Sequence, residues 1–73
     1  MFEFGDQVRI TQGLFRGMDG VVVTPEQAAQ ISPGACPSPA ILAGAAYFVS
    51  VPVFERQVVV QMLGSQIERI AAV

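Results

Sequence analysis

Two stretches in the first third of the chain carry the pattern of β-strands. In "DQVRI", Val8 and Ile10 fall on one face and polar residues on the other, which is the period-two alternation of a half-buried strand. "GVVVT" is a β-branched run that favours a second strand. The eight residues "QGLFRGMD" between them are too few for a helix and too many for a tight hairpin. We therefore expect strands near residues 6–11 and 20–24, joined by a glycine-containing loop.

The second half of the chain predicts a hairpin. "AGAAYFVSVPVF" leads into a strand near 47–54, and "RQVVVQML" gives another near 57–63. The short separation between these runs requires a tight turn. Pro52 has no N–H group, so its nitrogen should face outward at an edge or bulge. A short final strand or turn is expected near 66–70.

These strands are short, and the chain has only 73 residues, which is near the lower end of what one core can stabilise. A two-sheet sandwich with a full core is therefore excluded. Closure into a small, strongly bent barrel would remove the exposed edges. The sequence predicts an all-β fold, a small antiparallel barrel of four or five strands forming a single domain over residues 1–73, with Val21 and Val23 among its core residues. Glycines are expected where the chain turns, kinks or enters a strand: Gly5, Gly13, Gly17 and Gly20.

A proline- and alanine-rich insertion is expected at 25–46, between the second and third strands. Pro25 can open one helical turn through Gln30, and the later prolines then predict an irregular lobe outside the barrel. The lobe is uncharged after Glu26, so we expect it either to pack over one barrel opening or to mediate self-association. Its prolines also exclude a membrane span, because a spanning helix needs about 20 apolar residues.

Two quoted stretches resemble a known family. "GDQVRITQGLFRGMDGVVV" resembles the KOW motif, and "VSVPVFERQVVVQMLGSQIERI" is similar to the end of the carboxy-terminal domain of the NusG family of transcription factors. The resemblance covers 2–24 and 47–70 and implies a five-stranded, antiparallel SH3-like barrel that binds proteins. It implies a module of the transcription/translation machinery, acting in elongation, termination or antitermination. The implied partners are a Rho-like termination factor or a small-subunit ribosomal protein. The family's polymerase-binding domain has no counterpart here, so polymerase binding is not expected.

The resemblance also implies a binding surface. In the family it is an apolar patch on the loops between strands one and two and between strands three and four. Phe15 is expected to be its exposed aromatic anchor, with Phe2 and Phe4 bordering the patch. The protein-binding residues that the resemblance implies are Leu14, Phe15, Arg16 and Met18 in the first loop and Phe54 and Arg56 in the second.

Composition narrows the function further. Four arginines oppose six acidic residues, for a net charge of −2. Nucleic-acid binding is therefore expected to be weak or absent, because it requires a basic face. Cys36 is the only cysteine and there is no histidine or lysine, so we expect no catalysis, no metal and no cofactor. The amino-terminal "MFEFGDQVR" lacks the apolar run of a signal peptide, and a cytoplasmic location is expected.

Two alternatives stay open. One is a ribosome-associated, RNA-contacting KOW protein, although proteins of that class are usually rich in lysine. The other is a free-standing barrel that serves as a scaffold subunit.

Overall fold

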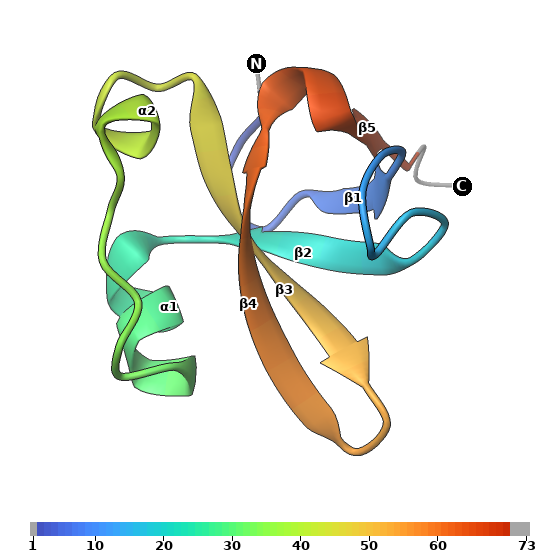
Figure 1. Cartoon of the computed structure of the whole chain (residues 1–73), viewed down its shortest axis with the longest axis horizontal. Helices are drawn as coiled ribbons and strands as arrows, with labels where there is room; N and C mark the ends of the chain where they lie inside the picture. The colour runs from blue at the N-terminus through green and yellow to red at the C-terminus, as the bar shows by residue number, and fades with distance from the viewer. Residues whose placement is uncertain (1, 71–73) are drawn as a thin grey trace.

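The computed structural model describes residues 2–70, which form one five-stranded sheet with two short helices (Figure 1). All strand pairs are antiparallel, and the order across the sheet is β4-β3-β2-β1-β5. The strands are β1 (Gln7–Ile10), β2 (Asp19–Val23), β3 (Ala46–Val53), β4 (Arg56–Leu63) and β5 (Ile67–Arg69). The predicted strands and hairpin are therefore confirmed.

The sheet is open, whereas a closed barrel was predicted. β4 and β5 are the two edges of the sheet, and they do not pair with each other within residues 2–70. A 3-10 turn, η1 (Gly64–Gln66), links them, and β5 is only three residues long. All three residues of β5 pair with β1, at Val8, Arg9 and Ile10. The short last strand thus extends the β1 side of the sheet without bridging to β4.

The main core lies on one face of this sheet, which we call the inner face. Its buried residues come from all five strands: Val8, Ile10, Val22, Val49, Val51, Met62 and Ile67. In β2 the core residue is Val22, so the prediction that Val21 and Val23 face this core was wrong. A run of three valines does not fix the phase of a strand. Here Gly20 and Val22 share the inner face, and Gly20 lies against β3 so closely that an added Cβ would stand 2.6 Å from Val49 Cγ1.

A second, smaller core covers the other face of the sheet, the outer face. Ala28 of helix α1 (Pro25–Ile31) is buried with Val23 and Phe48. The helix begins at a capping box, in which the Thr24 side chain and the Gln27 backbone N–H are hydrogen-bonded and the Gln27 side chain bonds back to the Thr24 backbone. The predicted helical turn after Pro25 is thus confirmed, and its burial comes from the sheet it covers.

The rest of the insertion is more regular than the predicted irregular lobe. It contains a second helix, α2 (Pro39–Leu42), which begins where the Ser38 side chain accepts a hydrogen bond from the Ile41 N–H. Both helices lie on the same side of the molecule (Figure 1). Proline breaks a helix in its interior but is favoured in its first turn, where its missing N–H has no partner to lose, and Pro25 and Pro39 both occupy that position. Within residues 2–70, no helix has the length and apolar character needed to cross a membrane.

Candidate protein-binding surface

The loops predicted to carry the binding site leave the sheet at the same end. β2 and β3 are antiparallel, with Val21 opposite Ser50, so the start of β2 lies beside the end of β3. The β1–β2 loop precedes that start, and the β3–β4 turn follows that end. We call this the loop end of the molecule, formed by residues 12–18 and 53–56. The structure thus brings the two predicted loops to one end of the fold.

The β1–β2 loop is held by its own backbone. The Gly17 N–H donates to the Ile10 carbonyl at 2.7 Å, and the Ile10 N–H donates to the Met18 carbonyl at 2.9 Å. Gly13 and Gly17 have φ of +89° and +88°, a conformation that favours glycine. The loop is therefore a defined turn built on two glycines, as the sequence predicted.

This turn exposes a different side chain from the one expected. Phe15 and Met18 are half-buried and pack against the inner core. Leu14 is 99% exposed and is thus the apolar residue that the loop presents to solvent. The expectation of an exposed Phe15 is corrected accordingly: Phe15 anchors the loop to the core on the inner face of the sheet, because its ring has apolar neighbours there.

The β3–β4 turn presents an aromatic ring. Phe54 is 100% exposed and has φ of 56°, the left-handed conformation that a residue with a Cβ seldom adopts. Phe54 and Glu55 form the two-residue turn, with Val53 opposite Arg56 at its base. An open depression of about 640 Å³ lies beside the turn, lined by Val53, Phe54, Glu55, Arg56 and Val58. A bulky aromatic residue is therefore held in solvent at a position where glycine or asparagine would fit the backbone better.

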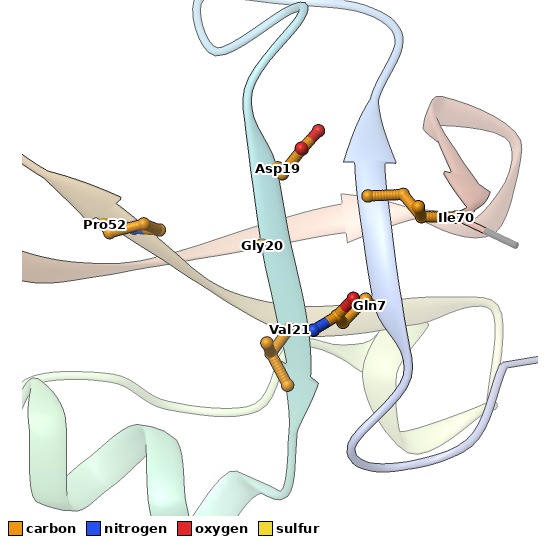
Figure 2. A pocket seen from close by; sticks show the side chains of 6 residues that line it. All are labelled: Gln7, Asp19, Gly20, Val21, Pro52 and Ile70. Carbon is orange, nitrogen blue, oxygen red and sulfur yellow. The ribbon is translucent and has the colours of Figure 1, made fainter. Parts of the chain in front are cut away.

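Between the two loops, the outer face of the sheet has a second shallow depression of about 290 Å³. Figure 2 shows Pro52 on one side of β2 and Ile70 on the other, with Asp19, Gly20 and Val21 along the strand. Pro52 lies two residues beyond Ser50, the last residue of β3 that pairs with β2. Its position outside the β2 ladder agrees with the prediction from its missing N–H.

The arginines divide into two kinds. Arg9 forms an ion pair with Asp19 at 2.9 Å, and this hydrogen-bonded carboxylate raises the pKa of the Arg9 guanidinium. Arg69 is hydrogen-bonded to Asp6. Arg16 and Arg56 are exposed, and within residues 2–70 neither makes a side-chain hydrogen bond or ion pair. Both of these arginines lie at the loop end, Arg16 two residues after Leu14 and Arg56 two residues after Phe54.

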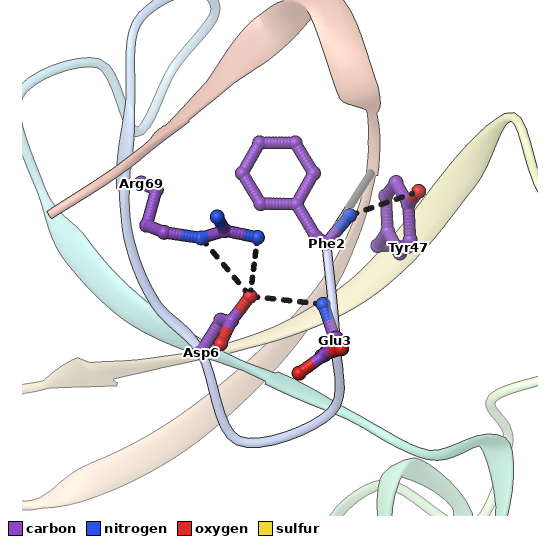
Figure 3. A network of polar contacts seen from close by, with 5 residues as sticks. All are labelled: Phe2, Glu3, Asp6, Tyr47 and Arg69. Carbon is purple, nitrogen blue, oxygen red and sulfur yellow. Dashed lines mark hydrogen bonds and ion pairs between the residues drawn. The ribbon is translucent and has the colours of Figure 1, made fainter.

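At the opposite end of the sheet, the chain start is covered by side chains (Figure 3). The rings of Phe2 and Tyr47 meet edge to face with centroids 5.4 Å apart, and the Arg69 guanidinium lies 5.6 Å from the centre of the Phe2 ring. Asp6 Oδ2 accepts hydrogen bonds from the Glu3 N–H at 2.9 Å and from Arg69 Nη2 at 3.0 Å. These bonds, with that from the Glu3 backbone contributing most, lower the pKa of Asp6 below its usual 3.8.

The prediction that Phe2 and Phe4 border the binding surface of the two loops was therefore wrong, because Phe2 packs against Tyr47 at the opposite end of the sheet. Phe4 is 63% exposed and lines an apolar cavity of about 160 Å³ with Ile41, Ala46 and Phe48. Leu42 of α2 is a further exposed apolar residue. Sequence reasoning missed this second apolar region, because it is formed by the chain start and the insertion, which only the fold brings together.

Sites for other chemistry are scarce in the part of the chain that is described. Residues 2–70 contain no group of three or more His, Cys, Asp or Glu side chains placed to hold a metal ion. Cys36 is exposed on the insertion. The loop end combines exposed apolar groups with two arginines that form no ion pair within residues 2–70, an arrangement that suits contact with another macromolecule.

Comparison with known proteins leaves the family undecided: no protein-family model matches the chain, and no curated protein matches it in sequence.

Proposed function

We propose that this chain is a non-catalytic protein-binding module of the transcription/translation machinery, similar to the carboxy-terminal domain of NusG, and that it binds its partner through the loop end. The observation that carries the proposal is the full exposure of Leu14 and Phe54, at 99% and 100%, on two turns at the same end of one sheet. Apolar anchors on loops that a rigid scaffold holds in place are typical of recognition surfaces.

The conformation of Phe54 strengthens this proposal. Left-handed backbone at a residue with a Cβ is unfavourable by about 1 kcal/mol, and full exposure gives the ring no compensating contacts within the domain. Such strain concentrates at functional positions. A phenylalanine at this position makes sense when a partner covers the ring.

The charges suggest the character of that partner. Arg16 and Arg56 are free to pair with carboxylates, and guanidinium groups bind carboxylates in bidentate geometry. The proposed partner surface is an apolar pocket with acidic residues around it, on a protein such as a Rho-like termination factor or a small-subunit ribosomal protein. The proposed fold is an SH3-like KOW barrel, supported by the five-stranded antiparallel sheet and the glycine-containing β1–β2 loop.

The test is a comparative pull-down from cells of the source organism, read by mass spectrometry. The wild-type chain and the double variant Leu14→Ser/Phe54→Ser are compared, with Phe4→Ser/Leu42→Ser as a matched control that changes exposed apolar residues elsewhere. We expect a transcription or ribosomal protein to bind the wild type and the control but not the loop-end variant. Equal capture by all three proteins would contradict the proposal.

A second assay separates protein binding from RNA binding. With a net charge of −2, the chain should bind mixed-sequence RNA weakly at physiological salt. Tight RNA binding that falls steeply with rising salt would favour the ribosome-associated, RNA-contacting alternative.

A further inference from the structure

The β4 strand forms a long edge of the sheet. It spans eight residues, Arg56–Leu63, and pairs only with β3 within residues 2–70 (Figure 1). Edge strands of soluble proteins usually carry charges, prolines or bulges that prevent pairing with other chains. Residues 57–63, "QVVVQML", contain neither charge nor proline. This edge is therefore free of the features that normally prevent strand pairing.

The hairpin geometry determines which backbone groups face the open side. Val53 and Arg56 flank a two-residue turn and so form the first hydrogen-bonded pair of the hairpin. Such pairs alternate along an antiparallel ladder. Residues 58, 60 and 62 thus bond to β3, whereas 57, 59 and 61 direct their N–H and C=O groups outward. The N–H of Leu63, the next residue in the series 57, 59 and 61, also points away from β3, and it donates to the Gln66 side chain at 3.0 Å.

The outward backbone groups lack partners within the described chain. Between residues 2 and 70, no backbone hydrogen bond outside the β3–β4 ladder involves Gln57, Val59 or Gln61. The strand is nevertheless held from its outer face: Val59 packs against the second core, and the Gln61 amide donates to the Cys36 carbonyl at 3.0 Å. The edge is thus ordered before any partner strand arrives, which lowers the entropy lost on binding.

The sequence of this edge specifies its own partner. "QVVVQ", residues 57–61, reads the same in both directions around Val59. We propose that two copies of the chain pair through antiparallel β4 edges, related by a two-fold axis at Val59. In this register Gln57 lies opposite the partner's Gln61, Val58 opposite the partner's Val60, and Val59 opposite itself. The N–H and C=O groups of residues 57, 59 and 61, which point to the open edge in each copy, then bond to those of the other copy and form about six backbone hydrogen bonds.

This register also satisfies the side chains. Cross-strand pairs of β-branched residues and of amides are favourable, and a two-fold interface requires such self-complementarity. Arg56 falls opposite Met62 of the second copy, so the two positive charges do not meet. The interface would join two five-stranded sheets into one continuous sheet. Leu14 and Phe54, the exposed apolar residues of the loop end, lie outside the paired strands.

Sedimentation equilibrium tests the dimer. The mass should rise from 7.8 kDa towards twice that value with a dissociation constant on the order of 100 μM, because the interface is only one strand wide. Gln57→Lys/Gln61→Lys places like charges opposite each other and should weaken association on the order of tenfold. Gln57→Glu/Gln61→Glu should do the same, and an equimolar mixture of the two variants should form a heterodimer. Gln7→Lys/Gln12→Lys changes two exposed glutamines away from β4 by the same charge and should leave association unchanged.

Amide hydrogen exchange of the wild type provides a readout that needs no variant. With rising concentration, the amides of Gln57, Val59 and Gln61 should gain protection, whereas those of Val58 and Val60 should be protected throughout. A chain that stays monomeric at about 1 mM, a lysine variant that dimerises like the wild type, or unchanged exchange at the three amides would each overturn the proposal.

Discussion

The two ends of the sheet differ in the environment of their phenylalanines: Phe2 is packed against other side chains, whereas Phe54 is exposed. At the chain-start end, Phe2 lies against Tyr47 and beneath Arg69, and Asp6 fixes that arginine in place. At the loop end, Phe54 is fully exposed, and the neighbouring Arg56 makes no side-chain hydrogen bond or ion pair within residues 2–70. Both ends thus place an aromatic ring near an arginine. The difference between them is that the Phe2–Arg69 contact is made within the domain, whereas Phe54 is fully exposed and, under the proposed function, is covered by a partner.

The largest expected effect concerns the base of the loop end. Gly20→Ala would place a Cβ 2.6 Å from Val49 Cγ1 and 2.7 Å from the Ser50 carbonyl oxygen. The backbone oxygen cannot rotate away, so β2 must move from β3, and we expect a loss of about 3 kcal/mol in the free energy of unfolding. Gly34→Ala is the matched control, because nothing lies within 4 Å of its added Cβ. Urea unfolding of both variants is the measurement, and equal stability of the two would contradict the close approach.

Alanine substitution of Phe2 and of Phe54 compares directly how much each ring contributes to the free energy of unfolding. Phe2→Ala removes a half-buried ring from the inner core and from Tyr47, and should lower the free energy of unfolding by about 2 kcal/mol. Phe54→Ala removes a fully exposed ring and should change it by less than about 0.5 kcal/mol. Chemical denaturation tests both variants. A large loss of stability in Phe54→Ala would show that the ring has a structural role.

A third substitution makes the strain at Phe54 visible. Phe54→Gly keeps the turn and removes the Cβ that disfavours φ of 56°. It should stabilise the domain by about 0.5–1 kcal/mol relative to Phe54→Ala while removing partner binding. The readout is the difference in melting temperature between the two variants. A glycine variant that is less stable than the alanine variant would argue against backbone strain at this position.

The smallest effect is the acid response of the chain-start end. Because folding lowers the pKa of Asp6, its contribution to stability is complete above the unfolded value near 3.8 and is lost as the pH falls through the lower folded value. Asp6→Asn should therefore flatten the fall in stability below about pH 4. Thermal unfolding from pH 6 to pH 2 follows this change. A variant with the same acid dependence as the wild type would contradict the assigned role of Asp6.

The strands were predictable from sequence because alternation and β-branched runs depend on neighbouring residues. The side of the sheet that each residue faces was less predictable. The three consecutive valines of β2 do not show which face each occupies, and the structure places Val22 in the inner core and Val23 in the core on the outer face. Helix α2 was not predicted, because Pro39, its first residue, belongs to a proline-rich stretch that by itself predicts a loop. For both, the deciding contacts come from residues distant in sequence.

The candidate site was likewise predicted only in part from the sequence. The two loops could be located from glycines and strand spacing, but the exposed residue of the first loop is Leu14, with Phe15 turned towards the core. Which of two adjacent apolar residues is buried depends on the turn conformation. The Asp6–Arg69 contact, which joins residues 63 positions apart, had no local signal at all.

The most direct test of the account is to map the partner's footprint on the folded domain by NMR. The protein captured by the wild-type chain is purified and titrated into the isotope-labelled domain, and backbone amide shifts are followed. The account predicts that the largest changes occur at residues 13–18 and 53–56, with residues 2–4 and 40–44 unaffected. Changes concentrated around Phe4 and Leu42, with the loop end unchanged, would place the binding surface at the other apolar region and contradict the central claim.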